Sequence, residues 1–301
     1  MAPNAPGLRP YIINKDVGAP LQFDPDQWPA TNADGLPIIE PTPEQKYAFD
    51  TNGWLLIPSV LSEDDLRAMR EFCVLLHREP ESLPEHARGP LGGPTQKLID
   101  HPIVVGMLHE FAANPSLSSA QGYGFSLGSC QLWYRTSPSR RAEQEENKPF
   151  RPHNGNGLLR LPGDVLFYNA FPGKAFCPHI RVVWELNSVR KGRGGTMLVS
   201  ASHKSVYTAP DEIQDPKSNL WTDYGCPAGS VLLFAEPLTH SGHPWTDEEN
   251  DRIAIGCLYN PVDGGWPKRE KPHPELLRSM PPLRRTLFRD RYTFDNVVGE
   301  T

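Results

Sequence analysis

The sequence predicts a mainly β protein, in which N-terminal helices pack on the outside of a two-sheet sandwich or barrel. Three observations predict this class. Helix signals fall in the first third of the chain, and from about residue 119 short apolar runs recur between Gly, Pro, Asn and Asp. Proline accounts for 33 of the 301 residues, about twice its usual share of roughly 5%. Many turns and strand edges are therefore expected, because proline is excluded from helix interiors and central strands.

The first 40 residues are rich in Pro, Gly, Asn and Asp and show no periodicity. We therefore expect residues 1–40 to form an irregular arm that wraps a single domain of residues 41–301. A helix is expected to begin at Thr42, because this capping residue is followed by Pro43 at the first helical position and then by an acid near the positive end of the helix dipole. The helix is expected to end near Gly53.

Residues 54–57, with the sequence Trp-Leu-Leu-Ile, predict a strand that ends at Pro58. A second helix is expected to begin at Ser62, with Asp65 three residues further on in the manner of a capping box. Apolar residues recur after it at helical spacing, which indicates an amphipathic helix. A third helix is expected over residues 103–112.

The second half of the chain predicts six strands. Each is a short apolar run bounded by turn-forming residues. The predicted strands are residues 131–134, 165–168, 180–186, 196–199, 231–235 and 253–259. Helices come first and strands follow, with no internal repeat, so one β core with helices packed outside it is expected.

Charge and cysteine content exclude several classes of protein. The net charge is −6 and no cluster of Lys and Arg is long enough to bind a polyanion, so no nucleic-acid partner is expected. The five cysteines are odd in number and form no Cys-x-x-Cys, which favours free thiols in a reducing compartment over disulfides or a cysteine zinc site. No signal-peptide pattern is visible and no apolar run approaches the ~18 residues of a membrane span. We expect a soluble, cytoplasmic protein with no membrane partner.

Three stretches of the β region carry the residues typical of a metal site. They are residues 150–157 with His153, residues 194–204 with a Ser-His pair, and residues 238–242 with His240, which Arg252 follows. Their order and spacing resemble the phytanoyl-CoA dioxygenase family, whose pattern is His-x-Asp, an Asn-Gly … Pro-Gly-Ser-His stretch, a distal His and then an Arg. The resemblance covers about residues 42–262. Each motif alone is weak, and the ordered set is fairly specific.

The resemblance implies a double-stranded β-helix core of the jelly-roll or cupin-like type, with flanking N-terminal α-helices. It also implies an Fe(II)- and 2-oxoglutarate-dependent dioxygenase that hydroxylates a small organic or acyl substrate. His153 and His240 would be the metal ligands, because imidazole suits non-haem Fe(II). Arg252 would bind the far carboxylate of 2-oxoglutarate, since its planar fork matches a carboxylate. Gln131 and Tyr134 lie on the strand that lines the pocket in related enzymes, although plain core packing explains them equally well.

Other histidines compete for these roles. His203 lies in the Ser-His stretch, where the resemblance implies a structural role in closing a turn. His243 follows His240 by three residues and is the rival distal ligand. His179 begins an apolar strand and is not expected to bind metal.

One position departs from the family pattern, because Gly155 stands where the metal-binding aspartate is expected. Another oxygen could replace it, from Glu185, the Asn154 amide or water. Glu236 precedes His240 by four residues, but on a continuous strand this spacing is about 13 Å, too far for both to reach one ion.

The vacancy at Gly155 also allows two other functions. Aliphatic halogenases of this superfamily carry Gly or Ala at the equivalent place, where chloride enters the metal site. Alternatively, catalysis has been lost and the pocket only binds a ligand. Some branches of the family carry His-x-Gly without being known halogenases. We therefore rank the oxygenase first, the halogenase second and a non-catalytic binding protein third.

Overall fold

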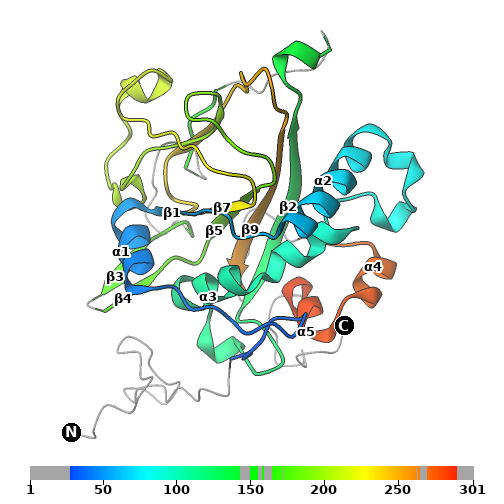
Figure 1. The fold of residues 1–301 in the computed structure, drawn as a ribbon. Helices are drawn as coiled ribbons and strands as arrows, with labels where there is room; N and C mark the ends of the chain where they lie inside the picture. The colour runs from blue at the N-terminus through cyan, green and yellow to red at the C-terminus, as the bar shows by residue number, and fades with distance from the viewer. Residues whose placement is uncertain are drawn as a thin grey trace, which may run out of the picture.

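The computed structural model describes residues 28–142, 150–154, 158, 165–171, 173–262, 264 and 270–289. Within these residues, helices precede a β region and two short helices follow it (Figure 1). In chain order the elements are α1 (Pro43–Asn52), β1 (Trp54–Ile57), α2 (Glu63–Arg78), α3 (Pro102–Phe111), β2 (Phe125–Arg135), β3 (Asn169–Phe171), β4 (Lys174–Phe176), β5 (Ile180–Glu185), β6 (Gly195–Leu198), β7 (Ser230–Ala235), β8 (His240–His243), β9 (Arg252–Pro261), α4 (Pro274–Ser279) and α5 (Pro282–Arg285), with short 3₁₀ turns between them.

The predicted boundaries of α1 and the predicted start of α2 are confirmed. Thr42 caps α1 by accepting a hydrogen bond from the Gln45 N–H, and the Gln45 side chain accepts one from the Thr42 N–H in return. Gly53 ends α1 in the left-handed conformation, with φ of 78°. Ser62 caps α2 through the Asp65 N–H. The third predicted helix is confirmed as α3, displaced by one residue.

The strands form a five-stranded antiparallel sheet in the order β1-β7-β5-β9-β2, and two further antiparallel pairs, β3–β4 and β6–β8. Isolated bridges extend the β6–β8 pair on both sides, since His153 pairs with His240 and Leu198 pairs with Thr222. The predicted mainly β class is therefore confirmed.

Two hydrophobic cores lie on opposite faces of the five-stranded sheet. In the outer core, side chains of this sheet pack against side chains of α1, α2 and α3, which cover one face of the sheet (Figure 1). The inner core joins the other face, here called the inner face, to β6 and to the loops around it. Because side chains alternate along a strand, β5 places Val182 and Trp184 in the outer core and Val183 in the inner core.

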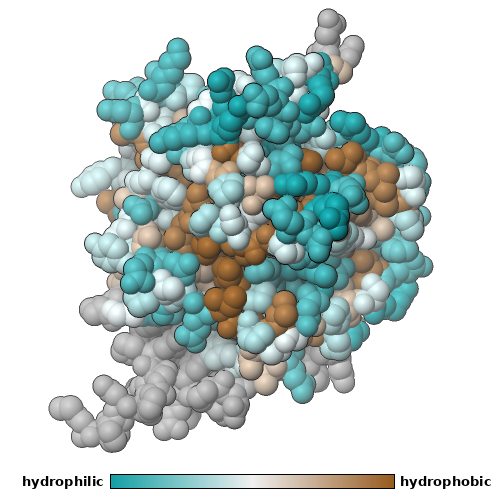
Figure 2. Space-filling model, in the orientation of Figure 1, coloured by the Kyte–Doolittle hydropathy of each residue, from teal (hydrophilic) through white to brown (hydrophobic). Residues whose placement is uncertain are grey.

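The surface in Figure 2 is mostly hydrophilic at its upper and outer parts, with hydrophobic side chains gathered across the middle. None of the helices in the described part of the chain has the length and apolar character that a membrane crossing demands. All five cysteines are buried and free, which confirms the prediction of free thiols.

One predicted strand is wrong. Residues 165–168 have no regular structure, and strand β3 begins only at Asn169. Their side chains serve loop contacts, since Leu166 is buried and the Tyr168 hydroxyl donates to Asp50 at 2.7 Å. Strand β8 was not predicted, because its sequence His-Ser-Gly-His contains no apolar run.

Residues 28–40 contact the helices. The Asn32 side chain donates to the Asp100 carbonyl at 3.1 Å, and the Ile39 N–H donates to the Pro102 carbonyl at 3.3 Å. Arg284 in α5 binds Asp34 at 2.6 Å and Asp100 at 2.8 Å. Ion pairs and hydrogen bonds thus tie this segment to the start of α3 and to α5.

Candidate active site

His153 and His240 lie side by side on paired backbones. Each backbone N–H donates to the carbonyl of the other residue, at 2.9 and 2.8 Å. Their ring centroids are 4.2 Å apart, with an interplanar angle of 54°. The structure therefore brings together the two histidines that the sequence selected from separate stretches.

Both imidazoles are oriented through Nδ1. The Nδ1 of His153 lies 2.8 Å from the Arg151 carbonyl, and the Nδ1 of His240 lies 2.7 Å from the Leu238 carbonyl. An Nδ1–H that donates to a carbonyl leaves Nε2 with a free lone pair, as metal-binding histidines require. Neither Nε2 has a hydrogen-bond partner in the described part of the chain. The donor set fits a divalent transition metal.

Burial keeps His240 neutral. Loss of solvent lowers the pKa of His240 to about 4, the charge of Glu236 opposes this shift, and His153 adds to it. A neutral imidazole is the form that binds metal.

An ion pair lies next to these imidazoles. The Phe234 ring is 4.7 Å from the His240 ring, and Phe234 is directly opposite Arg181 in the β5–β7 register. Arg181 binds Glu236 through Nε and Nη2, both at 3.2 Å. Burial raises the pKa of Glu236, but the charge of Arg181 and its hydrogen bonds outweigh it and hold that pKa below its ordinary value.

The chain turns between Glu236 and His240. Strand β7 ends at Ala235, the Leu238 N–H donates back to the Ala235 carbonyl at 2.8 Å, and β8 starts at His240. The chain is therefore not a continuous strand between Glu236 and His240, as the 13 Å spacing had assumed. Among the described residues, no His, Cys, Asp or Glu completes a three-ligand group with the two histidines. Gly155 lies outside the described residues.

Arg252 is buried at the start of β9 and already holds one carboxylate. Its Nε and Nη2 donate to Glu185 at 3.2 and 2.5 Å, and Nη2 also donates to Thr196 at 3.2 Å. The Tyr224 hydroxyl donates to the same carboxylate at 2.6 Å. Nη2 thus uses both of its N–H groups, on Glu185 and on Thr196. Nη1 donates no hydrogen bond to the described residues, so its N–H groups can bind a second carboxylate.

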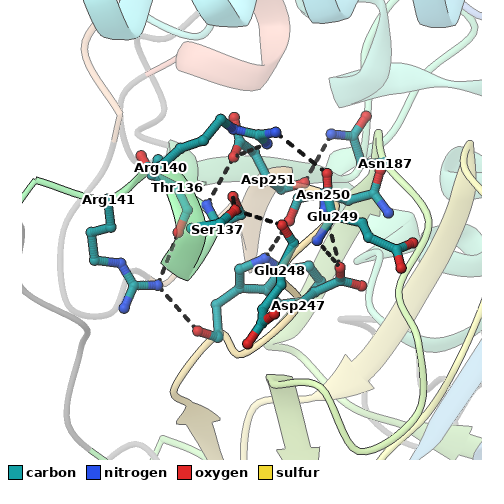
Figure 3. Close-up of polar contacts among 12 residues, drawn as sticks. Thr136, Ser137, Arg140, Arg141, Asn187, Asp247, Glu248, Glu249, Asn250 and Asp251 are labelled. Carbon is teal, nitrogen blue, oxygen red and sulfur yellow. Dashed lines mark hydrogen bonds and ion pairs between the residues drawn. The ribbon is translucent and has the colours of Figure 1, made fainter.

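A polar network fixes the entry to β9 (Figure 3). The Asp251 carboxylate accepts from the Ser137 N–H at 2.8 Å and from Arg140 at 2.7 Å. The Asn187 side chain donates to the Asp251 carbonyl at 2.9 Å. These bonds anchor the residue that precedes Arg252.

Gln131 and Tyr134 point away from each other. The Tyr134 ring stacks on His77 of α2 at 4.1 Å and its hydroxyl donates to Asp251 at 2.8 Å, so Tyr134 lies on the helix-covered face. The exposed Gln131 accepts from Trp133, whose ring lies 5.7 Å from the Arg252 guanidinium. Gln131 and Tyr134 both border a cavity of about 620 Å³ between β2, α2 and residues 88–90. Tyr134 is thus separated from the imidazoles by the sheet.

The other histidines lie elsewhere. His243 is opposite Gly195 on β8, is partly exposed, and is not the histidine that faces His153. His203 is buried, with Nε2 3.1 Å from the Asp50 carbonyl at the end of α1.

Sequence reasoning missed the ion pairs of two charged residues of β5, and named Glu185 only as a possible metal ligand. Arg181 and Glu185 interrupt an otherwise apolar strand at positions four apart. Residues at this spacing share one face of a strand, and a buried charge requires a partner. That pattern was visible in the sequence and could have revealed two internal ion pairs.

No family model and no curated protein matches this chain. Solved structures do match it. HygX from Streptomyces hygroscopicus with iron bound has a TM-score of 0.57 and 22% identity, over 75% of this chain and 89% of HygX. HygX with nickel and 2-oxoglutarate bound gives the same TM-score and identity, over 75% and 88%.

SnoK, a non-heme alpha ketoglutarate dependent carbocyclase from nogalamycin biosynthesis, has a TM-score of 0.50 and 19% identity, over 83% of this chain and 94% of SnoK. The metal and cosubstrate named for HygX match the predicted Fe(II) and 2-oxoglutarate. At this level of identity, the comparisons show that the chain has the fold of these non-haem iron and 2-oxoglutarate enzymes.

Proposed function

We propose that this chain is an Fe(II)- and 2-oxoglutarate-dependent dioxygenase with a double-stranded β-helix core of the phytanoyl-CoA dioxygenase type. The observation that carries the proposal is the pair of neighbouring imidazoles, His153 and His240, whose Nε2 atoms have no partner among the described residues. The fold shared with HygX and SnoK supports it.

Each residue of the proposed site has its own role. His153 and His240 hold the iron through Nε2. Arg252 receives the far carboxylate of 2-oxoglutarate through the N–H groups of Nη1, while Glu185, itself bound by Tyr224, holds Nε and Nη2 in place. Iron and 2-oxoglutarate together supply the oxygen-activating chemistry when bound. Tyr134 acts indirectly by binding Asp251, the residue before Arg252, and Gln131 borders the nearby cavity.

The substrate we propose is a small polar or amphipathic molecule. The chain carries a net charge of −6 and no cluster of Lys and Arg suited to the phosphates of coenzyme A. A HygX structure holds hygromycin B, which is also a small molecule. We place the reaction on such a molecule and class it as hydroxylation.

A halogenase is the second candidate, and the glycine at position 155 favours it. A residue without a side chain leaves space beside the metal for chloride. A non-catalytic binding protein is the third candidate.

The test is anaerobic loading with Fe(II), followed by assay of 2-oxoglutarate conversion to succinate in air, with and without chloride. We expect succinate in the parent, none above background in His153→Ala or His240→Ala, and no chloride dependence. His243→Ala is the matched control, because His243 lies on the same strand and should retain activity. A chlorinated product would place the halogenase first. Bound iron without any succinate would place the binding protein first.

A further inference from the structure

Two of the free thiols lie directly opposite each other on neighbouring strands. Cys130 of β2 is paired in register with Cys257 of β9, and their Sγ atoms are 3.7 Å apart. The Cys130 N–H donates to the Glu270 carboxylate at 2.9 Å, so it points away from β9. Opposed residues of this kind exchange no backbone hydrogen bonds, and their Cα atoms are about 4.5 Å apart. This spacing falls within the range of about 4.4–6.8 Å that a disulfide spans.

The two thiols differ in access. Cys130 borders the cavity of about 620 Å³ between β2 and α2 and is 6% exposed, whereas Cys257 is fully enclosed in the outer core. The hydrogen bond shared with Cys257, burial, and the neighbouring Glu270 and Cys73 raise the pKa of Cys130. A small neutral oxidant therefore reaches Cys130 first, and it meets a thiol that ionises weakly and reacts slowly near neutral pH.

We propose that Cys130 and Cys257 form a redox-active dithiol, which a peroxide converts to a disulfide between β2 and β9. The Cys130 sulfur attacks one oxygen of hydrogen peroxide and breaks the O–O bond, which gives a sulfenic acid and one water. The Cys257 sulfur then displaces the hydroxyl group of that sulfenic acid, which leaves with the Cys257 proton as a second water. The two thiols thus lose two electrons, and the peroxide is reduced to two waters.

The disulfide would act on the fold and not on the proposed metal site. Strand β2 is at the edge of the five-stranded sheet, where its neighbour is β9. Both cysteines lie in the outer core, on the helix-covered face. A covalent link between β2 and β9 closes a long loop of the unfolded chain, so the oxidised protein should be more resistant to urea than the reduced protein.

The inference is tested on the metal-free full chain, because bound iron would decompose the peroxide. After treatment with hydrogen peroxide, intact mass, peptide mapping and urea unfolding are measured. The parent should lose the mass of two hydrogen atoms and yield a peptide pair linked through Cys130 and Cys257. Its urea midpoint should rise by roughly 1 M, and dithiothreitol should reverse all three changes. Cys73→Ala is the matched control and should form the same link, because it removes the neighbouring buried thiol of α2.

Two further variants test the order of the steps. In Cys257→Ala, the sulfenic acid at Cys130 should persist and react with dimedone. In Cys130→Ala, neither a link nor a dimedone label should form at Cys257, because that thiol is enclosed. Peptide mapping of the parent decides the question even where a variant fails to fold. An unchanged parent mass, a link from Cys130 to Cys73, or oxygen added to Cys130 without a link would overturn the inference.

Discussion

The pairing of Arg252 with Glu185 determines how this arginine can recognise a cosubstrate. The pair is buried, with Glu185 fully enclosed, so the two charges largely cancel. An incoming carboxylate therefore meets little net positive charge. In the proposed site it must be selected by the directed N–H groups of Nη1, since Thr196 accepts from the neighbouring Nη2.

Replacing Arg252 should affect both binding and stability. Arg252→Ala should weaken 2-oxoglutarate by thirtyfold or more, because truncating one partner of a buried charge pair costs about 2–5 kcal/mol. It should also lower the free energy of unfolding by about 3–5 kcal/mol, since Glu185 is left buried and unpaired. Arg252→Lys should recover only part of either loss, because an ammonium cannot form the fork.

These effects are measured by 2-oxoglutarate titration of the metal-loaded protein and by urea unfolding. Arg67→Ala is the control, because Arg67 is exposed and pairs with Asp64 at the start of α2. An unchanged 2-oxoglutarate affinity in Arg252→Ala would move the cosubstrate site elsewhere.

At the scale of elements, the joint between α1 and β1 is tightly packed. Gly53 has φ of 78°, and a Cβ there would overlap the His203 ring and come within 2.8 Å of Leu238 Cδ1. The end of the first helix is therefore packed against the 3₁₀ turn of His203 and the segment before β8. This contact therefore links the end of α1 to the segment that leads into strand β8, which carries His240.

Gly53→Ala should consequently be more destabilising than Gly35→Ala. Both glycines have φ of 78°, so both variants incur the left-handed penalty of about 1–2 kcal/mol. Gly35 has open space around it, whereas Gly53→Ala adds overpacking worth about 1–3 kcal/mol. Urea unfolding of both variants measures the difference. Equal losses would show that the contact with His203 is loose.

The sequence correctly predicted the features that depend only on residues close together in the chain. The caps at Thr42 and Ser62 are local patterns, and both helices start where they predict. Strand β8 could not be predicted, because its pairing with β6 comes from the fold and not from apolar side chains. The same limit applies to the site. The two histidines were found from ordered motifs, whereas the position of Glu236 depends on a turn that strand periodicity hides.

At the scale of the whole molecule, His101 joins the helix layer to the sheet. It caps α3, its ring contacts Trp184 of β5 edge-on, and burial lowers its pKa from 6.5 to about 4. The folded state thus binds this proton more weakly than the unfolded state does. The stability that neutral His101 contributes is present above pH 6.5 and is lost as the pH falls toward 4.

His101→Asn should flatten this dependence. Asparagine is a good helix cap but does not titrate, so the cap is retained. Between pH 7 and pH 5 the metal-free parent should lose roughly 2 kcal/mol more stability than His101→Asn. Unfolding by urea at the two pH values measures it. Parallel losses in the two proteins would show that His101 is solvated in the folded state.

The strand order of the five-stranded sheet also sets the order of events during synthesis. β1 pairs with β7 from Trp54 to Phe234, and β2 pairs with β9 from Phe125 to Pro261. The three N-terminal helices therefore leave the ribosome long before the sheet that buries their apolar sides exists. Their apolar sides therefore stay exposed to solvent until β9, the last strand, has been synthesised and completes the sheet. A chain with such distant pairings folds slowly and late, which makes the nascent state its most aggregation-prone stage.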